Sequence, residues 1–135
     1  MSGAHTGLAR WHEVMEGGNA PAALAAIITE DAVFHSPVVH TPQHGRALVV
    51  AYLAAAGQVF ADGQFTYQRE IVDGNDAMLE FTAELDGIYI NGIDLITFDD
   101  DGFIKDFKVM VRPLKALNKL WEMMAAQLER AKSQS

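Results

Sequence analysis

Gly92-Ile93-Asp94-Leu95-Ile96-Thr97-Phe98 runs directly into Asp99-Asp100-Asp101-Gly102, and these two segments indicate the fold more clearly than any others. The β-branched and aromatic residues are typical of a strand, and the acidic run ending in glycine is typical of a hairpin turn. A carboxylate among apolar neighbours is costly to bury in its charged form. Asp94 is therefore either a hydrogen-bonded structural residue or an acid with raised proton affinity that acts on a ligand.

The second half of the chain predicts an antiparallel meander. Short turn sequences such as Asp86-Gly87 separate its segments of strand character, which is the pattern of consecutive hairpins. The predicted strands are residues 65–72, 77–85, 88–98 and 103–111.

The first half predicts helices. Residues 8–15 have helical spacing, Asn19 is expected to cap a short helix over residues 20–28, and residues 46–60 form a third helix. A strand over residues 32–36 ends at Pro37. After Pro113 a final helix carries an apolar stripe that we expect to pack on its own sheet or on a second subunit. Helices followed by a meander predict an α+β fold, with the helices packed on one face of the sheet.

Composition excludes several classes of protein. The chain has 135 residues, a net charge of −8 and no cysteine. Its scattered basic residues do not favour nucleic-acid binding, and the lack of thiols excludes disulfides and zinc–sulfur sites. We expect a cytoplasmic protein without membrane attachment, because no signal peptide and no apolar run of spanning length is present. No dinucleotide or phosphate-loop motif occurs, so we expect action without a cofactor.

Three segments carry a family resemblance: residues 29–37, the Gly45-Arg46 pair followed by Val49 and Tyr52, and the hairpin of residues 93–104. Together they resemble the nuclear transport factor 2-like superfamily, in particular the SnoaL-like polyketide cyclases and the ketosteroid isomerases. The resemblance covers roughly residues 8–112 of a single domain and leaves the C-terminal helix, residues 113–131, as an addition. It implies a cone-shaped fold with a cavity between the helices and a curved antiparallel sheet.

The comparison with ketosteroid isomerases implies roles for three residues. Asp94 lies at the position of the aspartic acid that binds the oxyanion, which stays protonated in an apolar site; that family is itself a standard example of this effect. Ser36 lies where those enzymes carry the general base, and His12 where they carry the oxyanion tyrosine. Serine cannot act as a carboxylate base, so steroid isomerisation by the family mechanism is disfavoured.

Other candidates for proton transfer remain open. Glu80 could supply a base if it faced the cavity, although strand alternation favours the opposite face. His12 and His35 either contact a ligand or are satisfied core or interface residues. His35, His40 and His44 do not match a metal-ligand template, so no metal site is expected.

These interpretations combine into one expectation. The cavity would bind a small apolar molecule carrying a carbonyl or phenol, and the protein would form a homodimer through its sheet. The protein would be either an isomerase, cyclase or dehydratase with Asp94 as hydrogen-bond donor, or a non-catalytic binding module. The residues expected to line the cavity beside Asp94 are Phe34, Ser36, Tyr52, Ile96, Phe107, Val109 and Val111.

Overall fold

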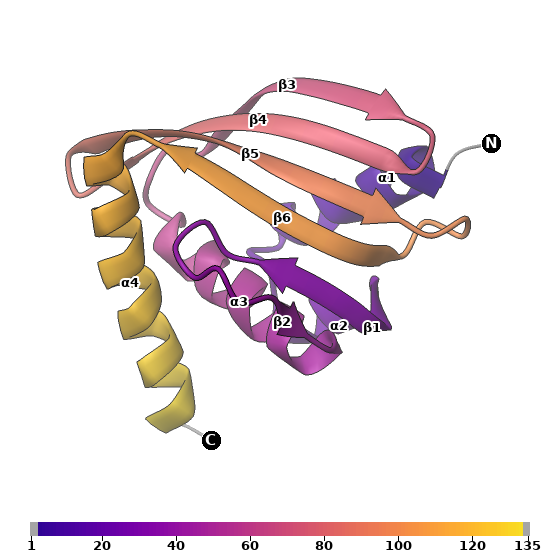
Figure 1. The fold of residues 1–135 in the computed structure, drawn as a ribbon, viewed down its shortest axis with the longest axis horizontal. Helices are drawn as coiled ribbons and strands as arrows, with labels where there is room; N and C mark the ends of the chain where they lie inside the picture. Colours follow the sequence, from indigo (N-terminus) through magenta and orange to yellow (C-terminus); the bar gives the residue numbers. More distant parts are fainter. Residues whose placement is uncertain (1–2, 134–135) are drawn as a thin grey trace.

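The computed structural model describes residues 3–133, and its order of elements confirms the predicted α+β class (Figure 1). The elements are α1 (Gly3–Glu16), α2 (Pro21–Ala25), β1 (Ile28–His35), β2 (Gln43–His44), α3 (Arg46–Val59), β3 (Thr66–Asp73), β4 (Asp76–Leu85), β5 (Ile88–Phe98), β6 (Ile104–Arg112) and α4 (Leu114–Ser133).

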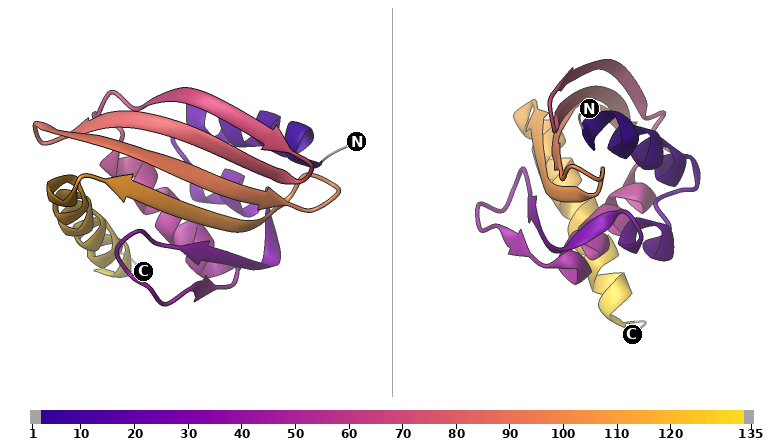
Figure 2. Two further views of the ribbon diagram at one scale, coloured as in Figure 1. Left: turned by 45° about the horizontal axis from the view of Figure 1, so that its top comes forward. Right: turned by 90° about the vertical axis from the view of Figure 1, so that its right-hand side faces the viewer.

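One six-stranded sheet, in the order β2-β1-β6-β5-β4-β3, forms one layer of the fold. Neighbouring strands are antiparallel except β1 and β6, which are parallel. The parallel pair and the short strand β2 were not predicted, because neither follows from hairpin signals. The views of Figure 2 show helices α1 to α3 on one side of the curved sheet and no helix over its other side.

Strand alternation decides which side chains face the helices. Leu79 of β4 pairs with Asp94 of β5, and Glu80 pairs with Ile93. Leu79 and Asp94 are buried on the inner face, whereas Glu80 and Ile93 lie on the outer face and are half-buried. The register therefore turns Asp94 towards the helices and Glu80 away from them.

The chain between α1 and α2 differs from the prediction. Asn19 does not cap α2, whose N-cap is Ala20 without a side-chain hydrogen bond. Instead Asn19 has a left-handed backbone, with φ of 57°, and its amide nitrogen donates to the carbonyl of Leu53 on α3. The predicted helix is also shorter than expected, because residues from Ile28 onward join the sheet as β1.

The C-terminal helix α4 packs chiefly along α3 and extends away from the end of β6 (Figure 1). Its buried residues Ala116, Leu120 and Met124 join an apolar cluster with side chains of α3, β4 and β5. The predicted stripe packs within this chain only in part. Met124 is buried and Leu117 and Leu128 are half-buried, whereas Leu114 and Trp121 are 72% and 48% exposed. Within residues 3–133, no helix combines the length and hydropathy needed to cross a membrane.

Candidate functional site

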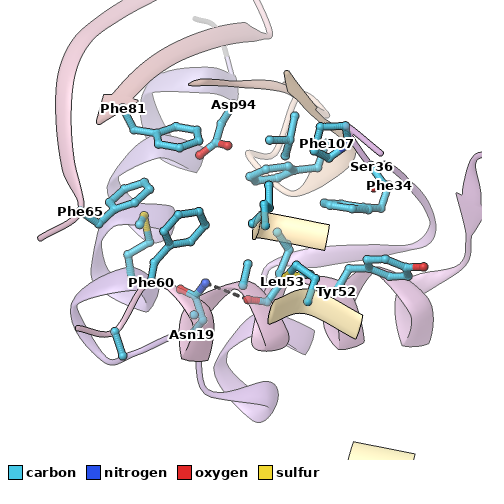
Figure 3. A pocket seen from close by; sticks show the side chains of 18 of the residues that line it. Asn19, Phe34, Ser36, Tyr52, Leu53, Phe60, Phe65, Phe81, Asp94 and Phe107 are labelled. Atoms are coloured by element: carbon cyan, nitrogen blue, oxygen red, sulfur yellow. Dashed lines mark hydrogen bonds between the residues drawn. The ribbon is translucent and has the colours of Figure 1, made fainter. Parts of the chain in front are cut away.

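A cavity of about 510 Å³ lies between the inner face of the sheet and helices α1, α3 and α4 (Figure 3). This volume falls within the range of about 300–1,000 Å³ that is common for small-molecule sites. Most of its lining is aromatic or aliphatic. The lining residues are Trp11, His12, Met15, Glu16, Gly18, Asn19, Phe34, Ser36, Pro37, Val38, Tyr52, Leu53, Ala56, Gly57, Phe60, Ala61, Phe65, Tyr67, Phe81, Asp94, Phe107, Val109, Leu120, Trp121, Met124 and Leu128.

Asp94 is the acid of this cavity. Its side chain points into the open space between Phe81 and Phe107 (Figure 3), and the residue is only 6% exposed. Burial raises the pKa of Asp94 from 3.8 to about 7, while a hydrogen bond from Tyr67 acts in the opposite direction. Near neutral pH the carboxyl group is therefore present in both protonation states.

Tyr67 and Trp11 hold Asp94 in place. The hydroxyl of Tyr67 donates to Oδ2 of Asp94 at 2.6 Å, and Nε1 of Trp11 donates to the Tyr67 hydroxyl at 3.0 Å. Burial, followed by the charge of Asp94, raises the pKa of Tyr67 well above its usual value, so Tyr67 stays a donor. The hydrogen bonds of residues 3–133 leave Oδ1 of Asp94 unused, and it is the atom available to a ligand.

His12 lies at the same cavity and is paired with a carboxylate. Its Nε2 atom contacts Oε1 of Glu70 on β3, and its ring packs edge-on against Tyr67 at a centroid distance of 5.7 Å. A carboxylate partner orients an imidazole and accepts a hydrogen bond from it. The pair can therefore hold and move a proton, which the apolar wall around it cannot do.

Ser36 also lines the cavity, but its hydroxyl is engaged locally. Its Oγ atom accepts hydrogen bonds from the backbone amides of Val38 and Val39, at 3.1 and 3.3 Å. Those bonds shape the turn after β1. The serine thus lies at the cavity with its hydroxyl oxygen engaged in the turn.

Two predicted candidates lie away from the cavity. Glu80 is on the outer face, where Asn91 and Arg69 donate hydrogen bonds to it and lower its pKa. His35 points away as well, and its Nε2 atom lies 2.9 Å from Oδ1 of Asp106. The proposed base role of Glu80 and the ligand role of His35 are therefore not supported by their positions, and strand alternation is the reason in both cases.

Of the six apolar residues predicted to line the cavity, four do so and two do not. Phe34, Tyr52, Phe107 and Val109 lie along the cavity, and the ring of Tyr52 stacks on Phe34 at 5.0 Å. Ile96 is instead fully enclosed in the core. Val111 packs on the apolar cluster that contains α4, away from the cavity lining.

Sequence reasoning missed several lining residues. Tyr67 has the same strand parity as its partner Phe81, so the pattern contained that signal. Glu70 and Asn19 gave none, because their roles depend on contacts with His12 and α3. The C-terminal stripe was recognised as apolar, but nothing in its spacing assigned Leu120, Trp121, Met124 and Leu128 to a cavity wall.

The described part of the chain contains no cluster of three or more His, Asp or Glu side chains arranged to hold a metal ion. Proton transfer and hydrogen bonding are the chemistry that the lining residues themselves can perform.

The raised pKa of Asp94 predicts how stability depends on pH. The unfolded chain ionises Asp94 above about pH 4 and the folded chain only above about pH 7, so the free energy of unfolding falls as pH rises between these values. A pKa difference of about 3 corresponds to a loss of about 4 kcal/mol. Urea unfolding of wild type and Asp94→Asn from pH 4.5 to 8 measures this loss, since asparagine does not titrate. The free energy of unfolding of wild type, relative to that of Asp94→Asn, should decrease as pH rises.

Glu80→Gln is the matched control, because it makes the same carboxylate-to-amide change on the outer face of the sheet. The pKa of Glu80 is lowered from 4.5 in the folded protein, and the unfolded chain ionises this group at about 4.5. The difference between wild type and Glu80→Gln should therefore be nearly constant from about pH 5.5 to pH 8. A stability difference between wild type and Asp94→Asn that stays constant with pH would contradict the buried, protonated acid.

The comparisons with known proteins agree with this geometry. The model of the SnoaL-like domain matches residues 8–107. A steroid delta-isomerase from Pseudomonas aeruginosa is 37% identical, with 98% of this chain and 96% of that chain covered and a TM-score of 0.91. A protein with a cystatin-like fold from Silicibacter pomeroyi is 35% identical, with coverage of 93% and 86% and a TM-score of 0.84.

A nuclear transport factor 2-like protein from Mesorhizobium loti is 23% identical, with 82% of this chain and 92% of that chain covered and a TM-score of 0.71, and it supports the fold alone. Comparison with curated proteins gives no match. The domain match covers well over half of the chain and includes Asp94 and the cavity residues of α1, α3 and strands β3 to β5, so the chain belongs to the SnoaL-like family, with the nuclear transport factor 2-like fold.

Proposed function

We propose that this protein is a cofactor-independent enzyme of the isomerase, cyclase or dehydratase type that acts on an apolar carbonyl or phenolic compound. The observation that carries the proposal is the Asp94 carboxyl group, which faces an apolar cavity with one oxygen free and one held by Tyr67. A protonated acid in such a place donates a hydrogen bond to a carbonyl oxygen. That bond strengthens as the oxygen gains charge in an enolate-like transition state.

The proton itself needs a second group, and His12 is the best placed. It lines the cavity beside Tyr67 and has Glu70 as its carboxylate partner. In the proposed reaction the neutral imidazole removes a proton from the carbon next to the carbonyl, and the same imidazolium returns it to the carbon where the product requires it. Asp94 stabilises the oxygen between the two steps without gaining or losing a proton.

The similarity to a steroid delta-isomerase supports carbonyl chemistry as the general class. This similarity does not extend to the general base. By resemblance, Ser36 occupies the position of the base in ketosteroid isomerases, and its Oγ atom accepts hydrogen bonds from two backbone amides. We therefore propose a different base on the same kind of cavity, and we leave the identity of the substrate open within carbonyl and phenolic compounds.

The second candidate is a non-catalytic binding module. The observation that favours it is the exposure of His12, whose side chain is 38% exposed. Water can reach a base at the edge of a cavity and hydrogen-bond to it in place of the substrate, which makes the base less effective. Both candidates bind the same ligands, and they differ only in whether a proton is exchanged.

Ketone binding should depend on pH through Asp94. The acid donates to a carbonyl only when protonated, so affinity for acetophenone, 2-acetonaphthone or 5-androstene-3,17-dione should fall about tenfold from pH 6 to pH 8. Asp94→Asn keeps a donor that does not titrate, and its affinity should be constant over this range. Calorimetric titration measures both, and Glu80→Gln should follow wild type.

Equal pH dependence in wild type and Asp94→Asn would exclude Asp94 as the carbonyl donor. A failure of every ketone and phenol to bind would exclude the proposed ligand class. A preliminary thermal-shift screen can select the tightest ketone, because a ligand at a hundred times its Kd stabilises by about 2.7 kcal/mol.

Proton abstraction distinguishes the enzyme from the binding module. With a ketone that binds, wild type in D₂O should replace the hydrogens beside the carbonyl with deuterium, which NMR spectroscopy follows directly. His12→Ala should slow this exchange by a factor of about 10² or more. His44→Ala, an exposed histidine on β2, is the control and should exchange at the wild-type rate. Binding without any exchange would favour the binding module.

We also propose that the protein forms a homodimer through the outer face of its sheet. This face is uncovered and carries the exposed apolar residues Ile71, Tyr89 and Met110, which are 52%, 62% and 51% exposed. Exposed apolar side chains gathered on one face are typical of an association surface.

Met110→Lys should shift the protein towards monomer in sedimentation equilibrium, because it buries a charge in the proposed interface. Leu48→Lys changes a similarly exposed apolar residue on α3 and should leave the association unchanged. A monomeric wild type at every concentration tested would contradict the dimer.

A further inference from the structure

Two buried polar side chains stand out in the described part of the chain, and both line the same cavity. They are Asp94 at 6% exposure and Asn19 at 7%. Figure 3 shows them on opposite sides of the cavity, Asp94 on the sheet and Asn19 beside α3. A buried amide in an apolar site is costly unless its polar atoms are hydrogen-bonded, so its second polar atom calls for an explanation.

The orientation of the Asn19 amide is settled by its partner. The nitrogen donates to the Leu53 carbonyl at 3.0 Å, and a carbonyl can only accept, so the amide cannot be turned over. Its oxygen Oδ1 has no hydrogen-bond partner among residues 3–133. The single fully occluded side-chain polar atom without a partner in that part of the chain is Oγ1 of Thr29, so Oδ1 of Asn19 keeps accessible surface.

The local backbone is built to present this side chain. Asn19 has a φ of 57°, a left-handed conformation that asparagine tolerates better than most residues. Gly57 of α3 allows the close approach, because a Cβ atom there would lie 2.8 Å from Cβ of Asn19. Backbone strain and close packing of this kind are often found where a side chain has a task beyond folding.

The wall near Asp94 and Asn19 favours flat molecules. Phe65 and Phe81 stack at a centroid distance of 4.8 Å, and Phe60 meets Phe65 edge-on at 5.2 Å. Figure 3 shows these three rings on one side of the cavity, with Asp94 beside Phe81 and Asn19 below Phe60. Aromatic walls of this kind contact planar ligands by stacked and edge-to-face arrangements.

We propose that Asn19 is a ligand-binding residue that selects molecules carrying a hydroxyl donor at the end opposite their carbonyl. The inference rests on the proposed function, because Asp94 has to bind the carbonyl end. The ligand class is then a flat hydroxy-ketone whose carbonyl accepts from Asp94 and whose hydroxyl donates to Oδ1 of Asn19. A ligand without the hydroxyl leaves that oxygen unpaired and binds more weakly.

Matched pairs of ketones test this proposal. The pairs are acetophenone and 4′-hydroxyacetophenone, 2-acetonaphthone and 6-hydroxy-2-acetonaphthone, and 3-deoxyestrone and estrone, which differ in length. In the pair whose length suits the cavity, the hydroxyl should tighten binding to wild type about tenfold, as measured by calorimetry. The methyl ether of the same hydroxyl cannot donate and should lose the gain.

Asn19→Gly removes the amide while keeping the left-handed backbone, and it should abolish the gain from the hydroxyl. Affinity for the ketone that lacks the hydroxyl should change much less, because that ketone makes no hydrogen bond to Asn19. A purely structural effect of the substitution would instead weaken the binding of both members of a pair alike. Asn75→Gly is the matched control. It removes an asparagine that binds Gly3 and Asp100 and does not line the cavity, so the gain should persist. Asn19→Asp keeps an acceptor oxygen but can donate to the Leu53 carbonyl only when its carboxyl is protonated, so it should retain the gain in the acidic part of the pH range, which covers the case that Asn19→Gly does not fold.

An equal gain in wild type and Asn19→Gly would overturn the proposal, since the hydroxyl would then bind elsewhere. The absence of a gain in every pair, with the unsubstituted ketones still binding, would overturn it too and leave the proposed function intact. Failure of all the ketones to bind would overturn both.

Discussion

The hydrogen bond from Tyr67 to Asp94 is the interaction on which the site depends. It satisfies one oxygen of a buried acid without neutralising it by a cation, so the carboxyl keeps a high proton affinity instead of forming an ion pair. Trp11 completes the arrangement, because its indole donates to Tyr67 and sets the direction in which the tyrosine donates. A lysine or arginine in the place of Tyr67 would lower the pKa of Asp94. The ionised carboxylate could then no longer donate a hydrogen bond to a ligand.

The apolar wall matters to this chemistry as much as the polar groups do. Burial is the larger cause of the raised pKa, and burial at this site requires the helices as well as the sheet. Leu120 and Met124 of α4 line the cavity and belong to the core, so the C-terminal helix helps to keep water from the acid. An element that first resembles an addition to the family fold is therefore part of the apolar wall of the cavity that Asp94 faces.

The fold was predictable because its strands follow one another through hairpins. The alternation left open which face of residues 77–85 meets the cavity, and the pairing with β5 turns Glu80 outward. The parallel pairing of β1 with β6 was not predictable, since it joins strands far apart in the chain. The same limit applied to the site. Tyr67 and Asp94 meet only through the register of three strands, and Asn19 is oriented by a carbonyl of α3, which no local pattern reveals.

The two polar ends of the cavity differ in one physical respect that gives the site a direction. Asp94 titrates near neutrality and Asn19 does not titrate at all. A rise in pH therefore changes what the sheet side can bind, from carbonyl acceptors to hydroxyl or phenol donors, while the helix side keeps selecting a donor. A flat molecule with one acceptor and one donor consequently fits in a single orientation only while Asp94 is protonated. That orientation places its carbonyl against the acid on the side of the cavity where His12 packs against Tyr67, which is the arrangement that proton transfer next to a carbonyl requires.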